Sequence, residues 1–298
     1  MSAAPGVLVT RPHSPIVPQT RALPRTADAG PRPPLKWAGG KRWLVPHVAP
    51  LWRRFHGRRL VEPFCGGLAV ALGLRPARAR LSDINPHVVN FYRWLKRGLE
   101  VEAAMREIPM RNEQALFYRH RERFNCLVAA GAGECAEAAG LFYYLNRTGY
   151  NGLCRFNRKG EFNVPFGRYE RINYTIDFST YRTAFKRWDF SAGDFAALEL
   201  DPGDFIYADP PYDVEFTQYS KEQFGWAEQV RLAEFLARHR GPVVLSNQAT
   251  PRILRLYRKL GFSTRCLSAP RMISCTGNRT PAIEVLATKD IRGVRTGD

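Results

Sequence analysis

Short apolar runs are spaced along the chain, and several end in a polar residue where a loop should begin. Helical patterns separate many of these runs, for example at 226–238 and 251–259. Strands that alternate with helices predict a mostly parallel sheet with helices on both faces. The predicted strands are Arg59–Phe64, Ala79–Ile84, Phe185–Phe190, Asp204–Asp209, Pro242–Asn247, Phe262–Leu267 and Ala282–Ala287.

The last two predicted strands, 262–267 and 282–287, leave no room for a helix between them. We therefore expect them to pair antiparallel, so that the chain ends with an antiparallel strand. In sheets of this kind, ligands bind beyond the carboxyl ends of the strands. The polar residues that end the strands are the first candidates for a functional site.

The rhythm of strands and helices divides the chain into four regions. Residues 1–33 are rich in Pro, Arg, Ala and Thr and show little periodicity, which predicts a disordered tail. Residues 34–85 and 187–298 carry the predicted strands and form the two parts of one sheet domain. Residues 86–186 begin with helical patterns and continue into the polar and aromatic stretch NRTGYNGLCRFNRKGEFNVPFGRY. This region predicts an inserted, mainly helical module.

The charge of the chain favours a polyanionic partner. Lys and Arg number 45 against 27 acidic residues, which gives a net charge of +18. An Arg-rich codon usage in a GC-rich genome is the alternative source of this excess. The sequence lacks a secretion signal and any apolar run near the ~18 residues of a membrane span. The six cysteines form no C-x-x-C pair, so we expect reduced thiols and no metal site.

Two motifs at predicted strand ends suit a nucleotide-like ligand. LVEPFCGGLAVAL, at 60–72, is a strand, a tight turn and a helix, and its Gly66 and Gly67 would let backbone approach a ligand closely. A simple strand–helix turn explains it equally well. Asp83 ends the next strand, where an acid can accept hydrogen bonds from ribose hydroxyls. The alternative is that Asp83 or Asn85 caps the helix that follows Pro86.

The stretch DFIYADPPYD predicts a site rich in hydrogen-bond acceptors. Asp209 ends a strand, and Pro210 and Pro211 supply carbonyls but no N–H donors. Tyr212 adds a flat aromatic surface. A planar amine with two N–H donors would suit this arrangement. The alternative, a proline-rich turn after a strand, explains neither the acid before the prolines nor the aromatic residue after them.

These motifs together resemble a known family. LKWAGGKRWL, EPFCGG, SDIN and DPPY occur in the order typical of Dam-like, D12-class DNA adenine-N6 methyltransferases. The segment 146–169 resembles the DNA-reading segment of that family. The resemblance covers roughly 34–289. Each motif alone is moderately specific, whereas their joint order is highly specific.

The resemblance implies a Rossmann-like, S-adenosylmethionine-dependent methyltransferase fold with an inserted target-recognition module. It implies that S-adenosyl-L-methionine donates a methyl group to the N6 amino group of an adenine in double-stranded DNA, within GATC. The adenine must leave the duplex to be reached. Asp209 and Pro210 would accept its two N–H groups, Pro211 would fix the backbone, and Tyr212 would stack on the base. No metal is needed.

The resemblance also assigns positions for the cofactor. Trp37 resembles a cofactor contact, although a core aromatic is the alternative, and Asp83 resembles the ribose ligand. Asp189 is expected to end the third strand and meet the cofactor adenine. Lys36, in the same motif as Trp37, resembles a guanine contact. The expected cofactor-binding residues are Trp37, Lys41, Glu62, Phe64, Gly66, Asp83, Asp189 and Asp209.

The segment 146–169 supplies the remaining DNA contacts that the resemblance implies. Tyr150 and Asn151 resemble residues that wedge into the duplex beside the flipped base. Arg155 resembles a guanine reader, and Leu153 and Pro165 resemble apolar contacts to a thymine methyl. An ordinary basic β-hairpin is the alternative. The expected DNA-recognition residues are Lys36, Tyr150, Asn151, Leu153, Arg155, Pro165 and Tyr169.

Three other functions compete with this interpretation. A cytosine-N4 methyltransferase would more often carry Ser at the position of Asp209, and a protein-glutamine or RNA methylase would carry Asn there. A DNA-binding protein of the same fold could also have lost catalysis. The intact DPPY motif and Asp83 favour an enzyme. We expect double-stranded DNA as partner, no membrane, no obligate protein partner and a monomer in the cytoplasm of a bacterium or of a phage-infected cell.

Overall fold

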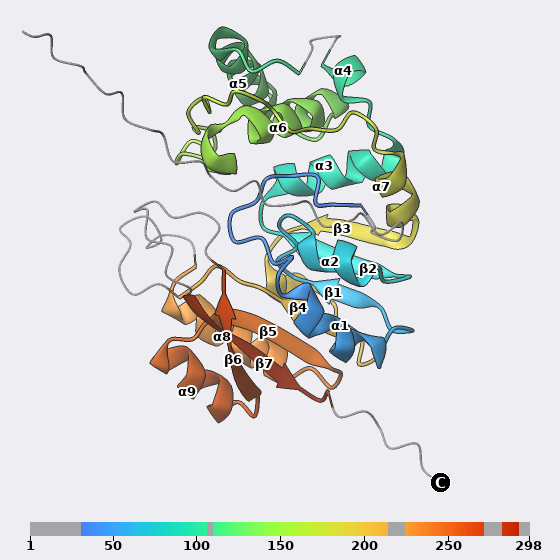
Figure 1. Ribbon diagram of the computed structural model, residues 1–298, viewed down its shortest axis with the longest axis vertical. Coiled ribbons are helices and arrows are strands. Elements are labelled where there is room, and N and C mark those ends of the chain that lie inside the picture. The colour runs from blue at the N-terminus through green and yellow to red at the C-terminus, as the bar shows by residue number, and fades with distance from the viewer. Residues whose placement is uncertain (1–30, 106–109, 214–223, 271–281, 292–298) are drawn as a thin grey trace, which may run out of the picture.

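The computed structural model describes residues 31–105, 110–213, 224–270 and 282–291 (Figure 1). All but the last three residues of the predicted tail, 1–33, lie outside the described residues. Within the described residues, no helix is long and apolar enough to cross a membrane.

Seven strands form one sheet in the order β3-β2-β1-β4-β5-β7-β6. Neighbouring strands from β3 to β5 are parallel, and β7 runs antiparallel to both β5 and β6. The predicted parallel sheet and the antiparallel pairing of the last two strands are confirmed. The strands are β1 Leu60–Glu62, β2 Ala79–Asp83, β3 Trp188–Ala192, β4 Phe205–Ala208, β5 Val243–Gln248, β6 Ser263–Ala269 and β7 Ala282–Lys289.

One predicted strand is shifted along the chain. The prediction placed the third strand at 185–190, but Phe185–Arg187 form a 3-10 turn and β3 begins only at Trp188. Phe185 is fully buried and its ring stacks on Trp188 at a centroid distance of 5.0 Å. An apolar residue that belongs to the preceding turn was therefore mistaken for the first residue of the strand.

The helices begin and end at local signals in the sequence. Asn85 caps α3 by accepting a hydrogen bond from the His87 amide, and Gly98, with a φ of 95°, ends that helix. Thr250 caps α9 in the same way. The helices are α1 Val45–Arg53, α2 Ala69–Leu74, α3 Pro86–Arg97, α4 Val101–Ala104, α5 Gln114–Ala129, α6 Ala136–Thr148, α7 Ser179–Ala184, α8 Trp226–Ala237 and α9 Pro251–Lys259.

The two faces of the sheet enter two different hydrophobic clusters. Side chains alternate along a strand, so Phe205 and Tyr207 of β4 face one cluster and Ile206 faces the other. The first cluster also contains residues of α1, α2 and α3, and the second contains residues of α8 and α9. The sheet therefore lies between two packed layers, one on each face. The acidic residues Asp83 and Asp209 lie at the edge where the parallel strands end.

The inserted region shares its core with the sheet. Figure 1 shows α3 between the strands and the pair α5 and α6. Phe91 of α3 stacks on Tyr143 of α6 with ring centroids 5.3 Å apart, and both rings belong to the first cluster. α3 also contacts β2 and β3. The inserted region is thus packed on the sheet through α3.

The segment before α1 contacts both the inserted region and the sheet. The Asn146 side chain of α6 bonds both the N–H and the C=O of Lys36, each at 2.8 Å. The Trp37 side chain lies on the turn after β1. A Cβ added to Gly66 would come within 2.6 Å of its indole Nε1, and one added to Gly67 within 2.8 Å of its Cβ. These glycines therefore let Trp37 approach the turn, a role that the sequence did not reveal.

Gly66→Ala should destabilise the fold because its φ is +42° and the new methyl group would meet Trp37. We expect a loss of at least about 2 kcal/mol in the free energy of unfolding, measured with urea. Gly57→Ala is the control, since no heavy atom lies within 4 Å of the added Cβ. Its change should stay within about 0.5 kcal/mol. Equal effects of the two substitutions would contradict the packing of Trp37 on Gly66.

Candidate active site at the carboxyl edge of the sheet

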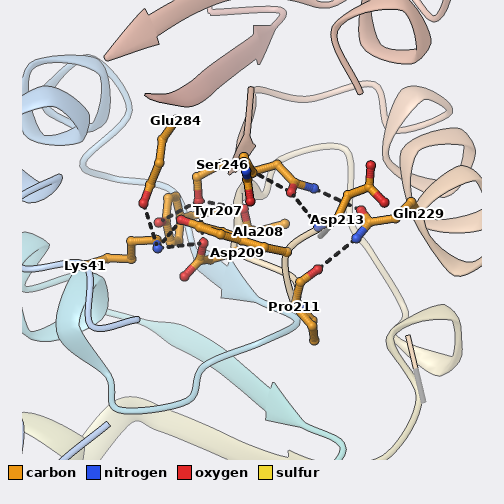
Figure 2. A network of polar contacts seen from close by, with 12 residues as sticks. Lys41, Tyr207, Ala208, Asp209, Pro211, Asp213, Gln229, Ser246 and Glu284 are labelled. Atoms are coloured by element: carbon orange, nitrogen blue, oxygen red, sulfur yellow. Dashed lines mark hydrogen bonds and ion pairs between the residues drawn. The ribbon is translucent and has the colours of Figure 1, made fainter. Parts of the chain in front are cut away.

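The turn 209–213 follows β4 directly and lies at the centre of a polar network (Figure 2). Asp209 Oδ1 accepts a hydrogen bond from Ser246 Oγ at 2.8 Å and lies 3.5 Å from Lys41 Nζ. Pro210 is buried, and no described residue donates a hydrogen bond to its carbonyl. The turn therefore contains two acceptors on consecutive residues, the Asp209 carboxylate and the Pro210 carbonyl.

The Asp209 carboxylate is largely removed from water, with 19% of its side chain exposed. Burial raises its pKa to about 6, while the Lys41 ammonium and the Ser246 hydroxyl favour the ionised form. Glu284 acts in the opposite direction, because a second negative charge disfavours ionisation. Asp209 is thus a largely buried acceptor whose charge depends on three neighbours, Lys41, Ser246 and Glu284.

Lys41 lies between three side chains of the site. Its Nζ is 3.5 Å from Asp209 Oδ1 and 3.6 Å from Glu284 Oε1. It also donates a short hydrogen bond to the Tyr212 hydroxyl and lies 4.3 Å from the centroid of that ring. The sequence places Lys41 in the first motif, far from 209–213, and the fold brings these residues together.

Two buried carboxylates near Asp209 keep an oxygen without a protein partner. Among the described residues, Glu62 Oε1 and Glu284 Oε2 are buried and accept no hydrogen bond. Burial and the neighbouring Asp209 raise the pKa of Glu62 well above its usual value. By strand alternation, Glu62, Asp209 and Glu284 lie on the same face of the sheet as Tyr207. Asp209 and Glu284 thus both lie beside Lys41, and the third carboxylate, Glu62, lies close enough to Asp209 to affect its own ionisation.

Asp83 and Phe64 lie at the neighbouring strand ends. The Asp83 carboxylate is buried and accepts the Gly66 amide at 2.9 Å and the Asn85 amide at 3.0 Å. Burial raises its pKa, and the two hydrogen bonds oppose this effect. The half-buried Phe64 ring lies 5.6 Å from Phe195, which follows β3. Asp83 therefore holds the glycine turn in place, whatever else it binds.

The prediction that Asp189 ends the third strand is wrong. Asp189 is the second residue of β3, its side chain is 84% exposed, and it pairs with Lys96 at 3.4 Å. The acid after the carboxyl end of β3 is Asp194, which forms two hydrogen bonds with Arg231. The error follows from the shifted strand, and Asp189 is the one predicted cofactor residue that the structure leaves apart from the others.

The predicted DNA-recognition residues gather around the carboxyl end of α6. Tyr150 is 51% exposed, and its amide donates to the Pro165 carbonyl at 2.9 Å. Lys36 Nζ donates to the Arg147 carbonyl and lies 3.7 Å from the centroid of the Tyr169 ring. The backbone forms bridges between residues 149 and 166 and between 156 and 162. The segment is therefore a hairpin-like surface beside the first motif.

Individual residues of this hairpin differ in their surroundings. Arg155 is exposed, and Asn163 holds its guanidinium through hydrogen bonds of 2.8 and 3.1 Å. Asn151 is exposed and has a φ of 51°, a conformation that Asn adopts more readily than most residues. Leu153 is half-buried and Pro165 is exposed. All of these predicted contacts thus lie on accessible parts of the same segment.

Sequence reasoning missed several residues of the network. Ser246 is the last residue but one of the predicted strand PVVLSN, so the rule of polar strand ends could have found it. Glu284 is the single acid in the apolar run AIEVLA, which is a weaker signal. Gln229 of α8 donates to the Pro211 carbonyl, and Asp213, the last residue of the turn, donates its amide to Asn247 of β5. Neither Gln229 nor Asp213 stands out by spacing.

Comparison with known proteins gives the family. A model of the D12 class N6 adenine-specific DNA methyltransferases matches residues 37–270. A DNA adenine methylase of Salmonella typhimurium is 37% identical over 268 residues, which cover 85% of this chain and 93% of that protein. A DNA N-6-adenine-methyltransferase of Escherichia phage P1 is 36% identical over 82% of this chain. The chain spans only 33% of the phage protein's length.

A solved structure of a putative RNA methyltransferase from Pyrococcus horikoshii covers 84% of this chain and 82% of its own, at 8% identity and a TM-score of 0.39. Such a low score carries no argument about function. The family model and the S. typhimurium relative each cover most of the chain. The chain therefore belongs to the D12 class of N6 adenine-specific DNA methyltransferases and has the Rossmann-like methyltransferase fold that its sequence predicts.

Proposed function

We propose that this chain transfers a methyl group from S-adenosyl-L-methionine to N6 of an adenine that has been flipped out of double-stranded DNA, within GATC. The observation that carries the proposal is the pair of adjacent acceptors at the carboxyl edge of the sheet, the Asp209 carboxylate and the Pro210 carbonyl. An adenine amino group offers two N–H donors in one plane, which matches two neighbouring acceptors.

The buried acids support a cationic cofactor. Glu62 Oε1 and Glu284 Oε2 need donors that the described residues do not supply. Three carboxylates against Lys41 leave the site with an excess of negative charge when all are ionised. S-adenosylmethionine carries a sulfonium and an α-ammonium group, which suit such a site, and it supplies an electrophilic methyl group. The residues present therefore fit this cofactor.

Further residues of the same edge would hold the remainder of the cofactor. Asp83 uses each carboxylate oxygen for one backbone amide, and each oxygen keeps a second lone pair for a ribose hydroxyl. Phe64, which is half-buried after β1 and backed by the buried Phe195 ring, offers a flat apolar surface. Trp37 acts mainly through the glycine turn, on which it packs.

The acceptors account for the chemistry that the protein must perform. The lone pair of the adenine amino nitrogen is delocalised into the ring, so the nitrogen is a weak nucleophile. Hydrogen bonds to Asp209 and Pro210 would orient the amino group and favour lone-pair density on N6. An Asp209 carboxylate with a pKa of about 6 can also take the proton that N6 loses after methyl transfer.

Base flipping requires a surface for the extruded adenine and a wedge for the duplex. Lys41 lies 4.3 Å from the centroid of the Tyr212 ring, so an adenine would stack on the opposite face. Tyr150 and Asn151 would enter the duplex, and Arg155 would read a guanine. We place the reaction in the cytoplasm, where the cofactor and chromosomal or phage DNA meet.

Asp209→Ala should abolish methyl transfer while most DNA affinity remains, because phosphate contacts dominate affinity. The measurement is nucleoside mass spectrometry of a GATC duplex after a single-turnover reaction, which separates N6-methyladenine from N4-methylcytosine. Asp189→Ala is the matched control, since that acid is exposed and distant from the network. N4-methylcytosine as the product, or a wild-type rate in Asp209→Ala, would overturn the proposal.

Arg155→Ala should reduce sequence discrimination more than affinity. A bidentate Arg–guanine contact contributes about ten- to a hundred-fold preference for the correct base. Rates on GATC and on each single-base variant at fixed salt measure this preference. Lys159→Ala is the control on the same hairpin and should slow all substrates by one common factor. If Arg155→Ala also slows every substrate equally, Arg155 contacts only phosphate.

Burial of the Asp209 carboxylate should lower the free energy of unfolding at a pH at which this group is ionised. The unfolded Asp209 has its ordinary pKa near 3.8 and the folded residue about 6, so the folded state binds more protons between these values. Asp209→Asn should therefore raise the free energy of unfolding above pH 6 by up to about 3 kcal/mol. This advantage should shrink as the pH falls from 6 to 4. Urea titrations across this range test it, and a difference independent of pH would contradict the assignment.

A further inference from the structure

Two neighbouring residues of β5 contact opposite ends of the turn 209–213. Ser246 Oγ donates to Asp209 Oδ1 at 2.8 Å, and Asn247 Oδ1 accepts the Asp213 amide at 3.3 Å. Successive side chains of a strand point to opposite faces of the sheet. The end of β5 therefore reaches the beginning of the turn on one face and its end on the other.

A buried pair of amides extends this contact to the middle of the turn. Gln229 of α8 donates from Nε2 to the Pro211 carbonyl at 2.7 Å and accepts at Oε1 from Asn247 Nδ2 at 2.9 Å. Asn247 Nδ2 also bonds the Tyr257 hydroxyl at 3.0 Å. Gln229 is 1% exposed and Asn247 is fully buried. Figure 2 shows Gln229 reaching toward Pro211.

The end of the turn has a third anchor. The buried Asp213 carboxylate receives two hydrogen bonds from the Arg252 guanidinium and one from Thr250 Oγ1 at 3.1 Å. Thr250 and Arg252 lie at the beginning of α9. Side chains from β5, α8 and the beginning of α9 thus all form hydrogen bonds with the turn 209–213.

The two prolines explain why the turn needs anchors from outside. Proline has no N–H, so within 209–213 only Asp209, Tyr212 and Asp213 can donate a backbone hydrogen bond. The turn must therefore be fixed through its carbonyls and side chains. Buried amides are costly unless fully bonded, and an apolar residue at 229 or 247 would fill the core equally well. Packing alone does not account for Gln229 and Asn247.

We infer that Gln229 and Asn247 form an amide clamp, a pair of positioning residues that fixes the Pro211 carbonyl and, through it, the neighbouring Pro210 carbonyl and Asp209 carboxylate. The clamp touches neither the base nor the cofactor and acts through the turn alone. This inference rests on the proposed function for its effect on rate. Its effect on the turn does not depend on that function.

Gln229→Met tests the clamp because it keeps the length of the side chain and removes both amide hydrogen bonds. We expect the single-turnover rate constant to fall about ten- to a hundred-fold, since a misplacement near 1 Å has effects of that size. The affinities for cofactor and DNA should change by less than about threefold. The control is Asn90→Leu, which removes two buried amide hydrogen bonds to the carbonyls of Gly133 and Cys135, far from the turn. It should lower the melting temperature comparably and leave the rate constant unchanged.

Hydrogen exchange gives a second readout that needs no activity. The Asp213 amide, which donates to Asn247, should exchange at least about tenfold faster in Gln229→Met and at the wild-type rate in Asn90→Leu. Unchanged exchange, or equal slowing of methyl transfer in both variants, would overturn the clamp. If the wild type transferred no methyl group, the proposed function would fail while exchange still decided the clamp.

Gln229→Glu covers the case in which Gln229→Met does not fold. An ionised Glu can accept from Asn247 but cannot donate to Pro211, whereas a protonated Glu can do both. The ratio of its rate to the wild-type rate should therefore be low at pH 8 and rise as the pH is lowered. Taking the ratio cancels the loss of rate that protonation of Asp209 causes in both proteins. A ratio independent of pH would contradict a donor role for Gln229.

Discussion

The site depends on one buried carboxylate that is kept near its ionisation point. Burial raises the pKa of Asp209 to about 6, and Lys41 and Ser246 limit the rise. An exposed Asp would be ionised but bound to water, so it would accept a base amine only after losing that water. Without Lys41 the pKa of a buried Asp would rise further, which favours the protonated form, and that form is a weaker acceptor. The surrounding residues keep Asp209 between these extremes, removed from most of the water but still able to ionise.

The first motif links this carboxylate to the rest of the molecule. Within seven residues, Lys36 is bound to the end of α6, Trp37 packs on the glycine turn, and Lys41 neutralises Asp209. A displacement of the hairpin-like segment 149–166 would therefore reach the turn through one short segment. If that segment reads DNA as proposed, this connection is a physical route from DNA binding to the geometry of the acceptors.

The fold was largely predictable because strand ends and helix caps are local signals. Six of the seven strands lie within a few residues of their predicted positions, and the parallel and antiparallel pairings follow from the spacing. β3 was misplaced since Phe185 belongs to a buried 3-10 turn, and Asp189 was misassigned with it. Burial of an aromatic residue in a turn is a tertiary effect that periodicity cannot reveal.

The candidate site was predictable where its residues lie at strand ends, as for Asp83 and Asp209. The residues that set their charge and position come from elsewhere in the chain and carry ordinary local patterns. Glu284 lies in a strand that passes beside the site, and Gln229 lies on a helix face that packing alone would fill with apolar residues. Their roles appear only when long-range contacts place them beside 209–213. A family resemblance indicated the acceptors but not these supporting residues.

The pH dependence of kcat/KM for S-adenosylmethionine, at saturating GATC duplex, tests most directly that an ionised Asp209 is the acceptor. This ratio reports ionisations that precede cofactor binding. The account predicts a rise with increasing pH through a single ionisation near pH 6, with a plateau above about pH 7, because the carboxylate must be charged. Asp209→Asn should have low residual activity without that ionisation. A wild-type profile that stays flat between pH 5 and 8, or the same ionisation in Asp209→Asn, would contradict it.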